Sequence, residues 1–383
     1  MLGGRPRNGF VRSLAQAVAA PSSEIWLAWP PATTASQTPM AEDSGPAKLL
    51  AMGGIRTAAA PVPVPVLYLF PVSFNAGKAK MAMQLSEKGA VAVDRFDSGF
   101  VLHMRDNYTL EYARLNPDTM AVPTLEIDDK VITESHEIVR YLFHNYPGPG
   151  DREVQASGRA AEMWAFVDLA RSWDEYVFTY GHMGAQSSDM ANGIRLLYLR
   201  YYLGQTLREK PEDEQVLVSA YVNKIAGIMT MNRVTGGGAT PEAKEKEMQT
   251  NRARLDGVLA AASALLGSSS GFLFGDQLCT ADACFLPILR TFLVATPAMF
   301  EVVFAKHPNL REYWERAQAS EDVQQALLRC VRKGALAWFM LKKRVPKTIL
   351  AYKMGLLRAP PLPDEIEERI RAAAVRKWQE VRG

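Results

Sequence analysis

The chain is poor in the residues that mark disulfide frameworks, metal centres and membrane spans. Its 383 residues include only 3 cysteines and 5 histidines. Cys279, Cys284 and Cys330 form neither a CxxC pair nor an even set, which favours a reducing, intracellular compartment. The histidines show no HxxxH or HExxH spacing, so we expect no metal. No apolar run reaches the roughly 18–20 residues that a membrane-spanning helix needs.

An excess of charge is also lacking. The formal net charge is +3, and charged residues make up 22% of the chain, so no dedicated nucleic-acid binder is expected. Hydrophobic residues make up 48%, which is ordinary for a globular protein with a real core. The length is sufficient for two domains.

The first 65 residues are predicted to be a disordered extension. They are rich in Ala, Pro, Ser, Thr and Gly, and alternating prolines occupy 61–65. Up to Ser23 there are arginines but no acidic residue, a pattern typical of an organellar transit peptide. The alternative is a disordered extension without a targeting signal, in which case the protein is expected to be cytoplasmic. The pattern does not separate plastid from mitochondrion.

From 66 to 147 the chain alternates short apolar runs with amphipathic segments. Gly89 follows the first expected helix, and Asp128–Asp129 separates two apolar runs as a hairpin turn does. We expect strands at 66–70, 91–93, 122–127 and 130–132, and helices at 78–88, 110–115 and 134–146. This order is the thioredoxin-like arrangement.

The rest of the chain is expected to be helical. Strand signals are nearly absent from 152 to 330, and the joints carry Gly and Pro, which predicts an α-helical bundle. The main expected helices are 160–178, 192–208, 214–231, 241–266, 280–293 and 310–318. Residues 331–383 are expected to form a basic helical tail.

Three motifs resemble the glutathione transferase superfamily by their order and spacing. They are 73–78, Asn116–Pro117 followed by Val122–Pro123 and Glu134–Ser135, and 275–282. The resemblance implies an α/β thioredoxin-like N-terminal domain that binds glutathione, followed by an all-α helical bundle. It also implies glutathione as co-substrate, a hydrophobic electrophile as second substrate, and a homodimer.

A narrower resemblance is to the plant class named after tetrachlorohydroquinone dehalogenase. It is carried by 173–175, 178–179, His182, 309–310, 312–314 and the basic, aromatic stretch 334–357. Reductive dehalogenation through a mixed disulfide needs a cysteine at the active position. No cysteine precedes Cys279, so neither that reaction nor thiol–disulfide exchange is expected here.

Ser73 is the candidate catalytic residue. A thiol with a pKa near 8.5 is mostly protonated at neutral pH, and its thiolate is the nucleophile. By the resemblance, Ser73 donates a hydrogen bond to the glutathione sulfur near the positive end of a helix, which favours the anion. The alternative role is an N-cap or loop serine.

Four further residues are predicted to bind glutathione by the same resemblance. Pro123 follows a cis bond that turns the Val122 backbone amide and carbonyl outward to pair with the extended tripeptide. Glu134 and Ser135 begin a helix whose first amides suit the γ-glutamyl carboxylate, and the Glu134 side chain suits its ammonium group. Simple strand initiation and helix capping are the alternatives. Ala121 is a departure, because many relatives carry a basic residue there.

The segment 275–282 is expected to cap a helix. Relatives place Ser or Thr where this chain has Cys279, a poor N-cap, so Thr280 is expected to take over by shifting the helix start while Asp282 faces the first amides. Cys279 and Cys284 are expected to be buried small apolar residues.

Aromatic and basic segments leave two questions open. Core packing is favoured over a pocket lining for the aromatic residues Trp164, Trp173, Tyr176, Phe178 and Tyr180. The basic segment 331–358 suits either an anionic membrane surface or a helix packed on the bundle. A non-catalytic scaffold or ligand carrier, which the basic segment would associate with a membrane, is therefore the alternative to an enzyme.

Overall fold

The computed structural model of the chain describes residues 65–70, 73–87, 106–183, 185–209, 215–235, 240–267, 271–295, 297–329 and 361–382. Three predictions lie outside these residues: nearly all of the N-terminal extension, the strand at 91–93 and the basic segment 331–358.

The described sheet has three antiparallel strands in the order β1-β2-β3. They are β1 (Val66–Tyr68), β2 (Thr124–Ile127) and β3 (Lys130–Ile132). Leu67 lies opposite Leu125, and every residue of the central strand β2 is buried. Asp128 and Asp129 make the hairpin turn at φ angles of 49° and 60°, which short polar side chains tolerate best after glycine.

The helices beside the sheet are α3 (Phe74–Leu85), α5 (Leu110–Leu115) and α6 (Ser135–Asn145). The bounds of α5 are those expected from the sequence, but the expected start of the first helix at Lys78 is wrong. Because the Ser73 hydroxyl accepts a hydrogen bond from the Ala76 amide at 3.4 Å, the helix begins at Phe74. A 3₁₀ turn, Asp106–Tyr108, precedes α5.

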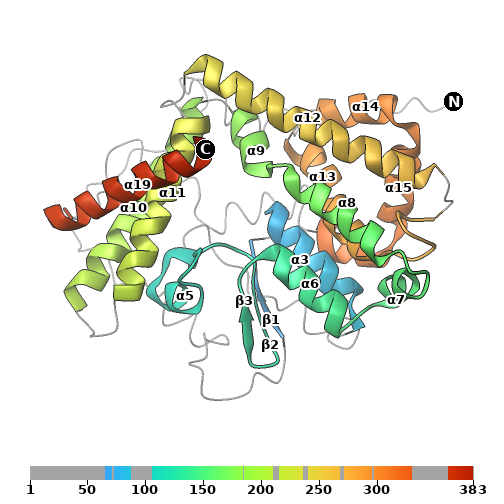
Figure 1. Cartoon of the computed structure of the whole chain (residues 1–383), viewed down its shortest axis with the longest axis horizontal. Helices are drawn as coiled ribbons and strands as arrows, with labels where there is room; N and C mark the ends of the chain where they lie inside the picture. The colour runs from blue at the N-terminus through green and yellow to red at the C-terminus, as the bar shows by residue number, and fades with distance from the viewer. Residues whose placement is uncertain are drawn as a thin grey trace, which may run out of the picture. The chain divides into compact units, whose positions relative to one another are not determined.

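The remainder of the described chain is helical (Figure 1). The elements are α7 (Pro149–Ala156), α8 (Ala160–Ser172), α9 (Glu175–Met183), α10 (Ala185–Glu209), α11 (Gln215–Thr235), α12 (Pro241–Leu266), α13 (Thr280–Ala295), α14 (Pro297–Lys306), α15 (Pro308–Ala319), α16 (Glu321–Val323), a π-helical turn Gln324–Leu328 and α19 (Asp364–Arg382). Among the described helices, none is both long enough and apolar enough to cross a bilayer.

One expected helix, 160–178, is divided into α8 and α9 at Asp174. The Asp174 amide donates to Asn251 Oδ1 at 2.8 Å, and Asn251 Nδ2 donates to the Asp174 carbonyl at 2.7 Å. Asp174 then caps α9 by accepting the Val177 amide at 3.0 Å. A side chain 77 residues away in α12 therefore fixes the break.

The start of α13 differs from the expected shift to Thr280. Cys279 keeps the cap position, and its amide donates to Asp282 Oδ2 at 2.9 Å, which is one half of a capping box. The other half comes from α7, where Asp151 accepts the Thr280 amide at 2.8 Å. The poor cap at Cys279 is thus compensated by a carboxylate from another helix.

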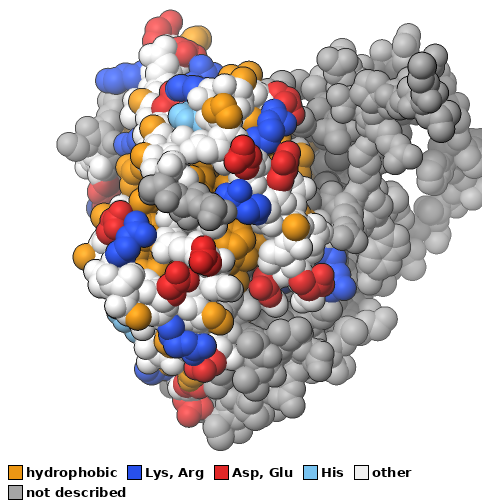
Figure 2. Space-filling model, turned by 90° about the vertical axis from the view of Figure 1, so that its right-hand side faces the viewer, with side chains coloured by type: hydrophobic (Ala, Val, Ile, Leu, Met, Phe, Trp, Pro, Cys, Tyr) orange, Lys and Arg blue, Asp and Glu red, His pale blue; other side chains and the backbone are white. Residues whose placement is uncertain are grey.

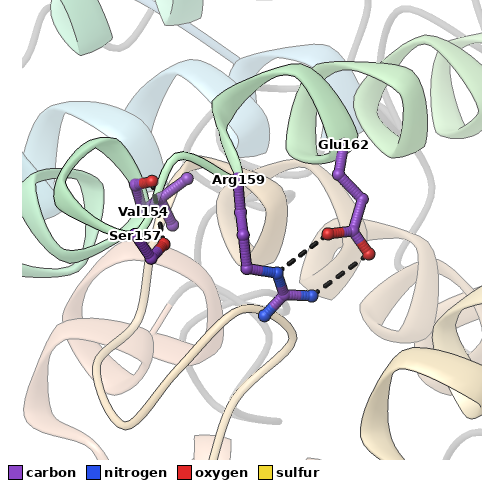
Figure 3. Close-up of polar contacts among 4 residues, drawn as sticks. All are labelled: Val154, Ser157, Arg159 and Glu162. Carbon is purple, nitrogen blue, oxygen red and sulfur yellow. Dashed lines mark hydrogen bonds and ion pairs between the residues drawn. The ribbon is translucent and has the colours of Figure 1, made fainter.

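The turn from α7 to α8 is held by local polar contacts (Figure 3). Arg159 donates two hydrogen bonds to Glu162, at 2.8 and 3.1 Å, and the Ser157 hydroxyl donates to the Val154 carbonyl at 3.0 Å. Gly158 takes a φ of 71°, a left-handed conformation that suits glycine.

The described residues form two apolar clusters. The larger one joins the sheet, α3 and α6 to α8, α12, α13 and α15. The smaller one joins α5 to α10, α11 and α19, three helices that lie side by side in Figure 1. The helices α10, α11 and α19 therefore share a second core with α5 of the sheet domain.

Candidate functional site

A cavity of about 1000 Å³ is lined by residues from both apolar clusters and from the loops beside the sheet. Ser73, Val122, Glu134 and Ser135 all line it. Pro123 is not among the lining residues, but the Val122–Pro123 bond that precedes it is cis, as expected. Four of the five residues singled out from the sequence therefore share one cavity.

Ser73 stands at the start of α3 with its hydroxyl oxygen already engaged as an acceptor of the Ala76 amide. This bond uses a lone pair, so the hydroxyl hydrogen can be donated to a ligand. Its carbonyl oxygen accepts from the Gly77 amide at 3.0 Å and from Arg290 Nη2 at 2.9 Å. Both the backbone and the side chain of Ser73 are thus held in position.

The loop that carries Val122 is fixed by Asn116. Asn116 Nδ2 donates to the Ala121 carbonyl at 3.1 Å and to Thr124 Oγ1 at 3.0 Å, while its Oδ1 accepts the Thr119 amide at 3.1 Å. Asn116 is fully buried, so these bonds are not shared with solvent. The Asn-Pro motif therefore holds the Val122 backbone at the cavity wall.

The N-terminus of α6 faces the same cavity. Glu134 is its N-cap and makes no side-chain capping bond, and Ser135 Oγ donates to Asn75 Oδ1 at 3.4 Å. Asn75 belongs to α3 and lines the cavity too. The two helix starts therefore converge there, and both direct partial positive charge toward a ligand.

The ionisable side chains of Lys78, Glu175 and Cys284 line the same cavity and are partly or fully buried. Lys78 is 7% exposed, its Nζ lies 4.1 Å from the Phe74 ring, and burial lowers its pKa. Burial raises the pKa of Glu175, although a hydrogen bond from Thr179 opposes the shift. Burial also raises the pKa of Cys284 to about 11, so this thiol stays protonated and is no nucleophile.

The aromatic residues named from the sequence divide between cavity and core. Trp173 and Tyr176 line the cavity, and the Tyr176 hydroxyl donates to Asn192 Oδ1 at 2.9 Å. Phe178 packs in the core, with its ring 5.4 Å from that of Trp173. Trp164 stacks on His144 away from the cavity, and the Tyr180 side chain lies outside the described residues.

Cationic residues in the cavity are the feature that sequence reasoning missed. They outnumber the acidic ones, which are Asp118, Glu134, Asp174 and Glu175. The lining cations are Lys78, Arg171, Arg195, Lys224, Arg254, Arg290 and Lys377. By contrast, basic and acidic side chains are interspersed on the outer face drawn in Figure 2.

A thioredoxin-like sheet domain followed by an all-helical domain is the architecture of the glutathione transferases. Residues 67–150 match the family model described as Glutathione S-transferase, N-terminal domain, and residues 210–321 match the model described as Glutathione S-transferase, C-terminal domain. The two matches cover about half of the chain in the family's order. The chain therefore belongs to the glutathione transferase superfamily.

A curated relative and two solved structures are similar to this chain. The tetrachloro-p-hydroquinone reductive dehalogenase of Sphingobium chlorophenolicum is 27% identical over 277 residues, covering 70% of this chain and 98% of the relative. The beta-etherase LigF from Sphingobium sp. strain SYK-6 is 19% identical, with a TM-score of 0.46 over 70% of this chain and 99% of that one. A glutathione S-transferase from Xylella fastidiosa is 19% identical, with a TM-score of 0.39 over 69% and 98%.

Proposed function

We propose that the chain is a glutathione transferase that binds glutathione and favours its thiolate. The thiolate is then conjugated to small hydrophobic electrophiles or reduces them. The observation that carries the proposal is the convergence of Ser73, Val122, Glu134 and Ser135 on one cavity. Membership of a family of glutathione-using enzymes supports it.

Ser73 is the proposed donor to the glutathione sulfur. Its hydroxyl hydrogen is available because its oxygen accepts from the Ala76 amide. The first amides of α3 add partial positive charge at the same place. Each unit by which these groups lower the thiol pKa corresponds to about 1.4 kcal/mol in favour of the anion.

The remaining glutathione contacts are proposed at the neighbouring wall. The Val122 backbone, held by the Asn116 hydrogen bonds, is suited to pair with the extended tripeptide. The start of α6 at Glu134 and Ser135 is suited to the γ-glutamyl carboxylate and ammonium groups. Trp173 and Tyr176 then offer an aromatic wall for the electrophile.

The test is isothermal calorimetry with glutathione, together with turnover of a hydrophobic electrophile by Ser73→Ala. We expect wild-type binding, and a loss of about 10²-fold or more in kcat with glutathione binding largely retained. No glutathione uptake by the wild-type protein would exclude the proposal.

Thr109→Ala is the matched control. Thr109 is the N-cap of α5 and accepts the Tyr112 amide at 3.4 Å, the same role and distance as Ser73, but it does not line the cavity. Loss of either cap costs about 1 kcal/mol of stability. Only Ser73→Ala is expected to lose turnover, and equal loss in both variants would reduce Ser73 to a capping residue.

The proposal includes further expectations from the sequence. We propose domain limits of 66–147 and 152–330, a homodimer, membership of the plant class, and a plastid or mitochondrial location. A scaffold on an anionic membrane is the alternative function. Vesicle flotation that depends on the basic segment 331–358, with no thiol transfer, is its signature.

A further inference from the structure

Three cations of the cavity occupy positions that amphipathic helices reserve for apolar side chains. In α10, Arg195 lies on the same face as the buried Asn192 and Leu199. In α11, Lys224 lies between the buried Tyr221 and Ile228 on one face. A helix that faces a core is expected to carry apolar residues at such positions, because a desolvated charge is costly.

Lys377 completes the set from the C-terminal helix. It follows the buried residues Ile366, Ile370 and Ala373 at helical spacing, so it lies on the inward face of α19. It is partly buried and lines the cavity, whereas its neighbour Arg376 is exposed and does not. The cavity-facing lysine is therefore distinct from the solvated basic residues of the same helix.

The position of Lys377 is fixed by contacts between α19 and its neighbours. Glu367 of α19 pairs with Arg200 of α10, and Arg369 Nη2 donates to Ser219 Oγ at 3.3 Å. Thr230 of α11 donates to the Ala374 carbonyl at 3.4 Å. These contacts span the helix ahead of Lys377, so its side chain enters the cavity from an anchored backbone.

The charges of Arg195 and Lys377 act on Lys224. Burial and these two positive charges together lower the pKa of Lys224 to about 8, while Glu134 opposes them. Lys224 Nζ donates to the Thr119 carbonyl at 2.8 Å, which is a neutral partner. Lysine and arginine side chains outnumber aspartate and glutamate side chains among the residues that line the cavity, so the cavity favours a bound anion.

The surroundings define the rest of the ligand. Arg195 lies over the Tyr176 ring, 5.8 Å from its centroid, and Ile228 and Met231 line the same cavity. We propose that Arg195, Lys224 and Lys377 form an anion subsite that selects an electrophile with an aromatic body and an acidic group. The proposal rests on the proposed function, because the electrophile is the second substrate of that cavity.

Two fluorescent probes with the same ring system test the subsite in the full-length protein. Anilinonaphthalene sulfonate carries the acidic group, and N-phenylnaphthylamine lacks it. We expect Lys224→Gln and Lys377→Gln each to weaken sulfonate binding by about tenfold, the loss of one charge-assisted contact, and to leave the neutral probe within about twofold. Arg376→Gln is the matched control and is expected to change neither affinity.

Lys377→Arg separates charge from folding, because it keeps the cation and is expected to restore sulfonate binding. Equal weakening of the binding of both probes, or no change with either, overturns the subsite.

Glutathione carries carboxylates of its own, so its affinity is measured by calorimetry in the same variants. If the lysine variants weaken glutathione and leave the sulfonate probe unchanged, the cations serve the tripeptide and the inference is wrong. If wild type binds no glutathione while the probes still discriminate, the proposed function fails and the subsite stands.

Discussion

The Arg290 guanidinium, 1% exposed in α13, donates a hydrogen bond of 2.9 Å to the Ser73 carbonyl oxygen. This bond joins residues 217 positions apart and ties the candidate catalytic residue to the helical domain. Gly77 makes it feasible, because a Cβ there would lie 3.1 Å from Arg290 Nη1. The glycine in the Ser73–Lys78 motif therefore has a packing role beside the candidate site.

A double-mutant cycle tests this relationship. Alone, Gly77→Ala is expected to destabilise, because the new methyl displaces the guanidinium from Ser73. In an Arg290→Met background the same change is expected to stabilise by up to about 1 kcal/mol, the helix-propensity gain of alanine over glycine. Urea unfolding of the four proteins gives the coupling energy. Additive effects would show that Gly77 and Arg290 do not interact.

Asn251 is predicted to position the aromatic wall. Asn251→Ala removes both bonds to the backbone of the part-buried Asp174, which we expect to cost about 1–3 kcal/mol of unfolding free energy. Because Trp173 and Tyr176 flank Asp174, KM for the electrophile is expected to rise more than kcat falls. Thr250→Ala, an exposed neighbour, is the control and is expected to leave both unchanged. A change in stability with an unaltered KM would restrict Asn251 to a folding role.

Asp151 is predicted to make stability fall as pH rises. Burial raises its pKa from 3.8 to about 6, so between these values the folded state holds a proton that the unfolded state has lost. The free energy of unfolding therefore decreases through this window, by about 2–3 kcal/mol for one group. Asp151→Asn keeps an acceptor for the Thr280 amide and cannot ionise. Denaturant titrations at pH 4 and pH 7 are expected to show a smaller decrease in the variant, and equal decreases would contradict the assignment.

Lys224 is predicted to set the upper pH limit of anion binding. Its pKa of about 8 means that it loses its charge as pH rises from 7 to 9, while Arg195 keeps its own. We expect the dissociation constant of the sulfonate probe to rise by about three- to tenfold over that range in wild type. The charged groups that act on Lys224 are Arg195, Glu134 and Lys377, and only Lys224→Gln is expected to flatten the profile. A profile unchanged by that substitution would assign the titration to another group.

Local patterns predicted the elements whose ends are set locally. α5, α12 and the β-hairpin follow from their caps, turns and periodicity, and their expected bounds are close to those observed. The division between α8 and α9 was missed because Asn251, far away in the chain, imposes it. The cap of α13 was wrong for the same reason, since Asp151 supplies it from α7.

The residues of the candidate site also divide into those that sequence motifs identified and those that only the fold brings together. Ser73, Val122, Glu134 and Ser135 belong to motifs with recognisable order, so the sequence was sufficient to single them out. Arg195, Lys224 and Lys377 come from three helices, and no spacing along the chain brings them together. The available signal was a charged residue on the inward face of each amphipathic helix, which becomes informative only once the helix bounds are known.

The helix α19 follows the segments that match the family, yet it supplies a wall of the cavity through Lys377. If the proposed anion subsite holds, selectivity for the second substrate depends on a helix outside the half that is proposed to hold the tripeptide. Substitutions on the cavity-facing side of α19 are expected to alter which molecules bind, while Ser73 and its neighbours stay as they are. Changes in this helix would let related chains differ in substrate selectivity while they keep the residues that are proposed to carry the catalysis.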